Sequence, residues 1–137
     1  MNLGIMMYNF LKALPMKITT HNIGQVDSIG NVIFMAGEER FATSNSTFLF
    51  HGIASSVQGV SVPQMKEAFS QLQNDEKRMT DILKANSEFK PSQLTKFYRE
   101  GRSIQPAEAL KCKVINEIKD VEIAPTARRV VVPTVKP

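Results

Sequence analysis

Apolar residues recur at helical spacing in two long stretches of this chain. The first stretch ends at Pro15, and the second runs from Pro63 to Asn86, where proline suits the first turn of a helix. A polar segment at 73–77 that includes charged residues interrupts the second stripe. This fits either a helix that leaves the body to meet another subunit or a solvated face. We expect the first stripe to be a core face. Its residues are Leu3, Met6, Met7, Phe10, Leu11 and Leu14.

Shorter apolar runs bounded by turn residues predict strands between these helices. The resulting mixture of short strands and helices predicts an α/β fold. Glu38, Glu39 and Arg40 are typical of a solvated turn. Strands are expected at residues 17–23, 47–51 and 114–118, and further helices at residues 28–36, 91–100 and 106–111.

The composition is that of an ordinary globular domain, with 42% apolar and 22% charged residues among 137. No apolar run reaches the ~20 residues that span a bilayer, and residues 1–14 lack the marks of a signal peptide. The single cysteine, Cys112, fits a reducing compartment, so we expect a cytoplasmic protein. The net charge is +4, without a basic stripe interleaved with aromatic residues. Neither a membrane nor a nucleic acid is an expected partner.

Ser28 lies where a predicted strand turns sharply into a predicted helix, between Gly24 and Gly30. A serine at such a turn presents its hydroxyl at the strand end, near the free N–H groups of the new helix. The hydroxyl is a candidate nucleophile, and the backbone N–H of Ile29 is a candidate donor to an oxyanion. The alternative is that Ser28 only caps the helix, a common use of serine at such turns.

His51 ends the predicted strand at residues 47–51 and is the candidate base for this serine. A lone histidine at a strand end is also commonly structural. Serine and histidine together predict acyl-transfer chemistry, provided that the fold brings them to one site.

Several short segments together resemble the catalytic core of the Clp protease proteolytic subunit family. The resemblance covers residues 1–119 and leaves residues 120–137 as a C-terminal tail that we expect to be flexible. It implies the fold of the Clp and crotonase type, in which helices wrap short stacked strands. The segments are Gly24-Gln25-Val26-Asp27-Ser28-Ile29-Gly30, Arg40-Phe41-Ala42, Asn45-Ser46, Phe50-His51 and Pro106-Ala107-Glu108-Ala109-Leu110.

The same resemblance implies an activity and partners. Members of the family are serine endopeptidases that form stacked rings and receive unfolded proteins from an ATPase. We therefore expect a ring-forming homo-oligomer, an ATPase unfoldase partner and peptide substrates, with no cofactor and no metal. Ser28 would attack the scissile carbonyl, His51 would transfer the proton, and the Ile29 N–H would bind the oxyanion. Residues 52–62 resemble the family's protruding handle, although an ordinary loop fits them equally well.

The sequence departs from the family pattern at the third catalytic position. Counted back from Pro106, the family's aspartate falls on Gly101. The adjacent Glu100 is the candidate replacement, although its neighbouring arginines also suit it to a surface ion pair. Asp27 is foreign to the family as well, and its charge would disfavour a nearby oxyanion.

The family's domain has an N-terminal part that would precede Met1. That part includes a glycine-rich turn that supplies a second N–H to the oxyanion. We therefore expect the chain to be a fragment, or to begin at an internal methionine, and to have little peptidase activity alone.

Two other functions fit part of the pattern. A non-catalytic structural subunit of the same family is consistent with the missing aspartate. A crotonase-type acyl-CoA enzyme shares the fold and commonly uses glutamates for proton transfer. The order of serine and histidine along the chain favours the peptidase.

Overall fold

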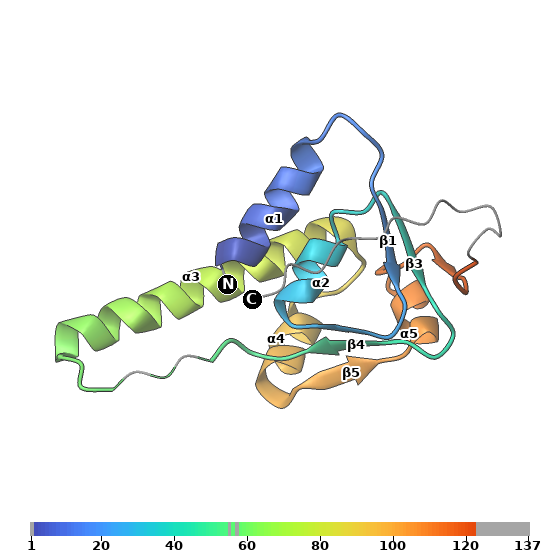
Figure 1. The fold of residues 1–137 in the computed structure, drawn as a ribbon. Helices are drawn as coiled ribbons and strands as arrows, with labels where there is room; N and C mark the ends of the chain where they lie inside the picture. The colour runs from blue at the N-terminus through green and yellow to red at the C-terminus, as the bar shows by residue number, and fades with distance from the viewer. Residues whose placement is uncertain (1, 55, 57, 123–137) are drawn as a thin grey trace, which may run out of the picture.

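The computed structural model describes residues 2–54, 56 and 58–122, in which helices and strands are mixed along the chain (Figure 1). The predicted α/β fold is confirmed, whereas most of the predicted tail at residues 120–137 lies outside the described residues. The helices are α1 (Asn2–Ala13), α2 (Ile29–Phe34), α3 (Val62–Asn86), α4 (Pro91–Glu100) and α5 (Pro106–Lys111). The strands are β1 (Thr19–Asn22), β2 (Gln25–Asp27), β3 (Glu39–Ala42), β4 (Thr47–Phe50), β5 (Arg102–Ile104) and β6 (Glu117–Ile118).

The strands form two small sheets. In one sheet β3 lies between β1 and β6, and both pairs are parallel. In the other sheet β4 lies between β2 and β5, parallel to β2 and antiparallel to β5. Ser28 follows β2 and His51 follows β4. Because β2 and β4 run in the same direction, these two residues leave the sheet at the same edge.

Aromatic side chains form the core beneath this edge. Phe48 and Phe50 lie two residues apart on β4, so their side chains share one face of the sheet, and both are buried. The ring of Phe50 lies 5.4 Å from that of Phe89 and 5.8 Å from that of Phe97, measured between centroids. Tilted and edge-on ring pairs of this kind stabilise a packed core. The cluster fixes the end of β4, and with it the position from which His51 leaves the strand.

The apolar stripe of α1 faces outward, so the prediction of a core face is wrong. The buried residues of α1 are Gly4 and Ile5, whereas Met6 and Phe10 are 60% and 59% exposed. A β-carbon at Gly4 would lie 2.1 Å from the side chain of Ile29, so only glycine allows this approach of α1 to α2. Helical spacing located the helix correctly but did not determine which side of it packs against the body.

The longest helix, α3, confirms the helix predicted from Pro63 to Asn86. Its first half projects from the body (Figure 1), and Met65 and Phe69 in that half are exposed. Its buried residues, Asp75, Met79 and Leu83, belong to the second half. The second half of α3 therefore packs on the domain and is available to line a site.

Residues 38–40 do not form the expected solvated turn, because Glu39 begins strand β3. The side chain of Arg40 donates hydrogen bonds to four backbone carbonyls and ties the segment after α2, the end of α3 and the turn after α5 together. The acceptors are the carbonyls of Gly37, Asn86, Lys113 and Val114, at 2.8 to 3.0 Å.

Candidate functional site

Ser28 occupies a strained turn between β2 and α2. Its backbone angles are φ 51° and ψ −122°, a region that residues with a side chain rarely adopt. Such a conformation costs about 1–3 kcal/mol and persists only where the surrounding structure fixes it. A strained turn from strand to helix is also the setting of the nucleophilic serine in α/β-hydrolases.

Hydrogen bonds to β4 hold this turn in place. The N–H of Ser28 donates to the carbonyl of Leu49 at 3.0 Å. The amide of the buried Asn31 donates to the carbonyls of Ser28 and Leu49, at 3.1 and 2.7 Å. The amide oxygen of Asn31 is buried and has no hydrogen-bond partner among the described residues. Asn31 thus ties the serine turn to the strand that leads to His51.

The contacts of His51 assign its tautomer. Its Nδ1 lies 2.8 Å from the carbonyl oxygen of Gly52. Because a carbonyl only accepts, the proton is assigned to Nδ1, and Nε2 keeps a free lone pair. This tautomer can take a proton from a serine. In the described residues His51 and Ser28 are not hydrogen-bonded to each other, and catalytic hydrogen bonds often tighten only when substrate is bound.

Gly52 brings the backbone after His51 against α4. A β-carbon at Gly52 would lie 2.7 Å from the carbonyl oxygen of Tyr98, so a larger residue would push the two segments apart. Tyr98 is itself buried, and burial raises the pKa of its phenol to about 12. The phenol is therefore neutral at physiological pH and belongs to the packed support behind His51.

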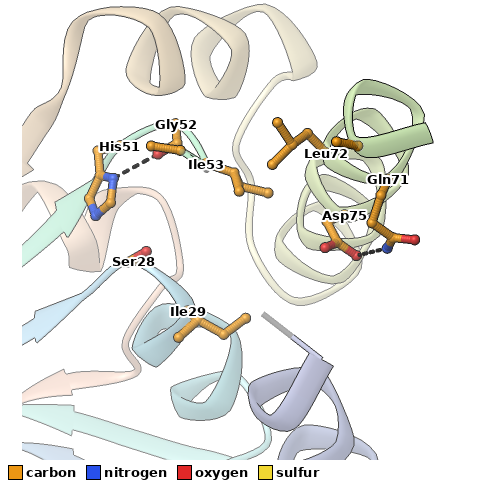
Figure 2. A pocket seen from close by; sticks show the side chains of 10 residues that line it. Ser28, Ile29, His51, Gly52, Ile53, Gln71, Leu72 and Asp75 are labelled. Atoms are coloured by element: carbon orange, nitrogen blue, oxygen red, sulfur yellow. Dashed lines mark hydrogen bonds between the residues drawn. The ribbon is translucent and has the colours of Figure 1, made fainter. Parts of the chain in front are cut away.

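Ser28 and His51 line one pocket with a volume of about 530 Å³ (Figure 2). A cavity of this size fits a small molecule or a large side chain. Figure 2 shows α3 on the far side of the pocket from His51. The other lining residues are Ile29, Gly52, Ile53, Ala54, Ala68, Gln71, Leu72 and Asp75.

Ile29 begins α2, so its backbone N–H has no acceptor within the helix. In α/β-hydrolases, the N–H of the residue after the nucleophile is one of the oxyanion donors. The pocket therefore combines a hydroxyl, an imidazole with a free nitrogen and an adjacent backbone donor. These are the kinds of group that acyl transfer needs.

Glu100 lies away from this pocket. Its carboxylate is 3.9 Å from Lys96 and 3.6 Å from Arg99, and it lines a separate cavity of about 390 Å³. Gly101 follows it with φ 71° and ends α4. Asp27 is exposed and is not among the residues that line the serine pocket. The structure thus places Ser28, Ile29 and His51 around one pocket. Asp27 and Glu100 lie outside it.

The sequence did not identify Asp75 as a residue of the site. Asp75 is only 5% exposed and lines the pocket from α3. The interruption of the apolar stripe at residues 73–77 suggested a contact with another subunit or a solvated face instead. A usable signal is the spacing, because Leu72 lies three residues before Asp75 and Met79 four residues after it, which places all three on one side of the helix.

Metal sites and membrane spans are absent from the part of the chain that the structure describes. Within residues 2–54, 56 and 58–122, no group of three or more His, Cys, Asp or Glu side chains is placed to hold a metal ion. None of the described helices combines the length and the hydropathy needed to cross a bilayer.

Comparison with known proteins gives one family. The sequence model of the family described as Clp protease matches residues 1–122. A curated relative, the ATP-dependent Clp protease proteolytic subunit of Deinococcus radiodurans, is 23% identical over 119 residues. The match covers 85% of this chain and 58% of the relative, so the chain spans little more than half of that relative's length.

Proposed function

The chain belongs to the Clp protease family, and on this premise we propose that it is a serine peptidase subunit in which Ser28 is the nucleophile. Family membership supports a protease in general. The observation that carries the proposal to named residues is that Ser28 and His51, far apart in the sequence, line the same pocket.

In the proposed reaction, His51 Nε2 takes the proton of Ser28 while the serine oxygen attacks the scissile carbonyl. The Ile29 N–H donates to the oxyanion, and His51 then gives its proton to the leaving amine. The same nitrogen then takes a proton from water, which attacks the acyl-serine, and returns this proton to the serine oxygen as the acyl group leaves. The Gly52 carbonyl keeps the proton on Nδ1 throughout. Glu100 takes the role of the orienting acid only if the end of α4 moves toward His51, since it lines another cavity.

The proposal includes the assembly and supply typical of the family. The subunit forms a homo-oligomer in the cytoplasm and receives unfolded polypeptides from an ATPase partner. Two observations support this part. The matched relative is named as the proteolytic subunit of an ATP-dependent protease. Large apolar side chains on α1 and on the projecting half of α3 are exposed, as expected for surfaces that contact other chains.

A fluorophosphonate reagent tests the nucleophile. The reagent forms a permanent bond with an activated serine, so the product accumulates and even a slow site is detected. We expect mass spectrometry to locate the adduct on Ser28, and Ser28→Ala to abolish labelling. Replacing the base should slow labelling, so we expect His51→Gln to lower the rate about 10²–10⁴-fold. Ser103→Ala, at an exposed serine of β5, should label at the rate of the unchanged chain.

A non-catalytic structural subunit is the second candidate, and one observation favours it. No carboxylate among the described residues is hydrogen-bonded to His51, whose Nδ1 contacts a backbone carbonyl instead. This candidate predicts a chain that assembles but whose Ser28 remains unlabelled after prolonged exposure to the reagent. That result would overturn the proposed peptidase.

A further inference from the structure

Asp75 places a negative charge in the wall of the serine pocket. Of the described residues that line the pocket, it is the only one with a carboxylate side chain. The walls around it include the apolar side chains of Ile29, Ile53 and Leu72. A carboxylate in such surroundings loses hydration, which is unfavourable unless donors or a cation compensate it. The pocket therefore has a fixed preference for a positive group.

Both donors that the structure provides reach the same oxygen of Asp75. Gln71 Nε2 lies 3.0 Å and Arg78 Nη1 lies 3.3 Å from Oδ1. Among the described residues, no hydrogen bond goes to Oδ2. Figure 2 shows the Asp75 carboxylate and its bond to Gln71 on the α3 wall of the pocket. One carboxylate oxygen is thus left for a ligand.

Arg78 compensates the charge from outside the pocket. Its side chain is 47% exposed and is not part of the lining. Its guanidinium also contacts the side-chain oxygen of Asn2 on α1 at 3.2 Å. The pair offsets part of the charge of the buried carboxylate, whose side chain is 7% exposed, and it leaves Oδ2 available to a cationic ligand.

We propose that Asp75 makes this pocket selective for a Lys or Arg side chain of a peptide bound beside Ser28. The inference rests on the proposed peptidase function and names its substrate preference. The aliphatic part of the basic side chain packs on Ile29, Ile53 and Leu72, while its charged end donates to Oδ2 of Asp75. Asp75 is then a residue that determines specificity and takes no part in proton transfer.

A purely structural role for Asp75 predicts different behaviour. In that case Asp75 would only hold Arg78, and through it the start of α1. Removing either side chain would then lower stability, and neither change would alter the choice of ligand. Variants of both residues therefore separate the two roles.

Equilibrium binding of para-aminobenzamidine to the 137-residue chain tests the proposal without requiring turnover. This cation fluoresces more strongly when it leaves water, and para-aminobenzamide is its neutral counterpart, whose binding is measured by competition. We expect the amidine to bind at least about tenfold tighter than the amide, as a charge-assisted hydrogen bond allows. Asp75→Asn should remove this difference. Glu76→Gln, which makes the same charge change at the next, exposed residue of α3, should keep it.

Each outcome decides the question. Equal affinity for amidine and amide in the unchanged chain, or a preference that survives in a folded Asp75→Asn variant, would overturn the proposal. If Asp75→Asn fails to fold, Arg78→Gln replaces it, and we expect that variant to bind the amidine more tightly because Oδ1 loses its ion pair. Unchanged or weaker amidine binding in Arg78→Gln would contradict the proposed selectivity of the pocket for a cation. If the chain prefers the amidine but Ser28 is not labelled, only the proposed peptidase function is overturned. If Ser28 is labelled but the chain does not prefer the amidine, only the proposed role of Asp75 is overturned.

Discussion

Ser28 holds a backbone conformation that suits glycine better than serine, at the position where the proposed chemistry needs a nucleophilic hydroxyl. We predict that Ser28→Gly is more stable than Ser28→Ala by about 0.5–2 kcal/mol, because glycine relieves the strain and alanine keeps it. The difference is smaller than the full strain, since glycine also increases the freedom of the unfolded chain. Urea unfolding followed by circular dichroism measures both variants, and neither has the hydroxyl.

The matched control for this comparison is Ser103 in β5, which has no positive φ. There we expect the order to reverse, with the glycine variant less stable than the alanine variant. If the glycine variant of Ser28 were less stable than the alanine variant by as much as at Ser103, the turn would carry no strain.

Single residues of the site differ in how well the sequence predicts them. Ser28 lies in a turn and His51 at a strand end, and both patterns can be recognised from the neighbouring residues in the sequence. Asp75 does not, because its burial depends on which side of α3 packs on the domain. Glu100 was proposed only from the number of residues that separate it from Pro106. That number does not determine how far the end of α4 lies from His51 in space.

At the scale of elements, helix ends follow local signals and were predicted well. Pro91 begins α4 and Gly101 ends it with a positive φ, as proline and glycine commonly do. The sequence did not predict β5, whose three residues pair with the distant strand β4. The outward face of α1 was also missed, because periodicity defines an apolar side without defining its partner.

Arg40 joins several elements, so its geometry should matter more than its charge. We predict that Arg40→Lys lowers the free energy of unfolding by about 2–4 kcal/mol, because a lysine cannot reach the four carbonyls that the guanidinium fork binds. The denaturant midpoint, at an unchanged slope, measures this loss.

Arg102→Lys is the control for Arg40. Arg102 contacts Glu108 at 3.1 Å in a solvent-accessible ion pair, so its replacement should change stability by less than about 0.5 kcal/mol. A comparable small effect at Arg40 would show that its hydrogen bonds to the four carbonyls contribute little to the fold.

At the scale of the whole molecule, the arrangement of the sheets decides whether the site exists. Ser28 and His51 line one pocket because β2 and β4 are parallel neighbours in one sheet, while β1 and β3 pair in another. The strand predicted at residues 17–23 is confirmed as β1, but the sequence did not predict β2, which starts at Gln25, belongs to the other sheet and leads to Ser28. Pairing between distant strands, which local patterns do not specify, therefore made the pocket.

The exposed apolar face of α1 gives the last prediction, which concerns the proposed homo-oligomer. If this face contacts a second copy of the chain, sedimentation should show association that increases with concentration. Burying a phenylalanine contributes about 1.5–3 kcal/mol, so Phe10→Lys should weaken association by about 10- to 100-fold. Because Phe10 is exposed in the single chain, the change should leave the fold intact, which circular dichroism can verify.

Asn9→Lys adds the same charge at the adjacent exposed residue of α1 and should associate nearly as the unchanged chain does. Phe69→Lys applies the same test to the projecting half of α3, where Phe69 is 61% exposed. Loss of association in Phe69→Lys alone would move the contact from α1 to α3. A chain that remains monomeric at every concentration would contradict self-association through either face, because both apolar surfaces would then stay in water without a second copy to cover them.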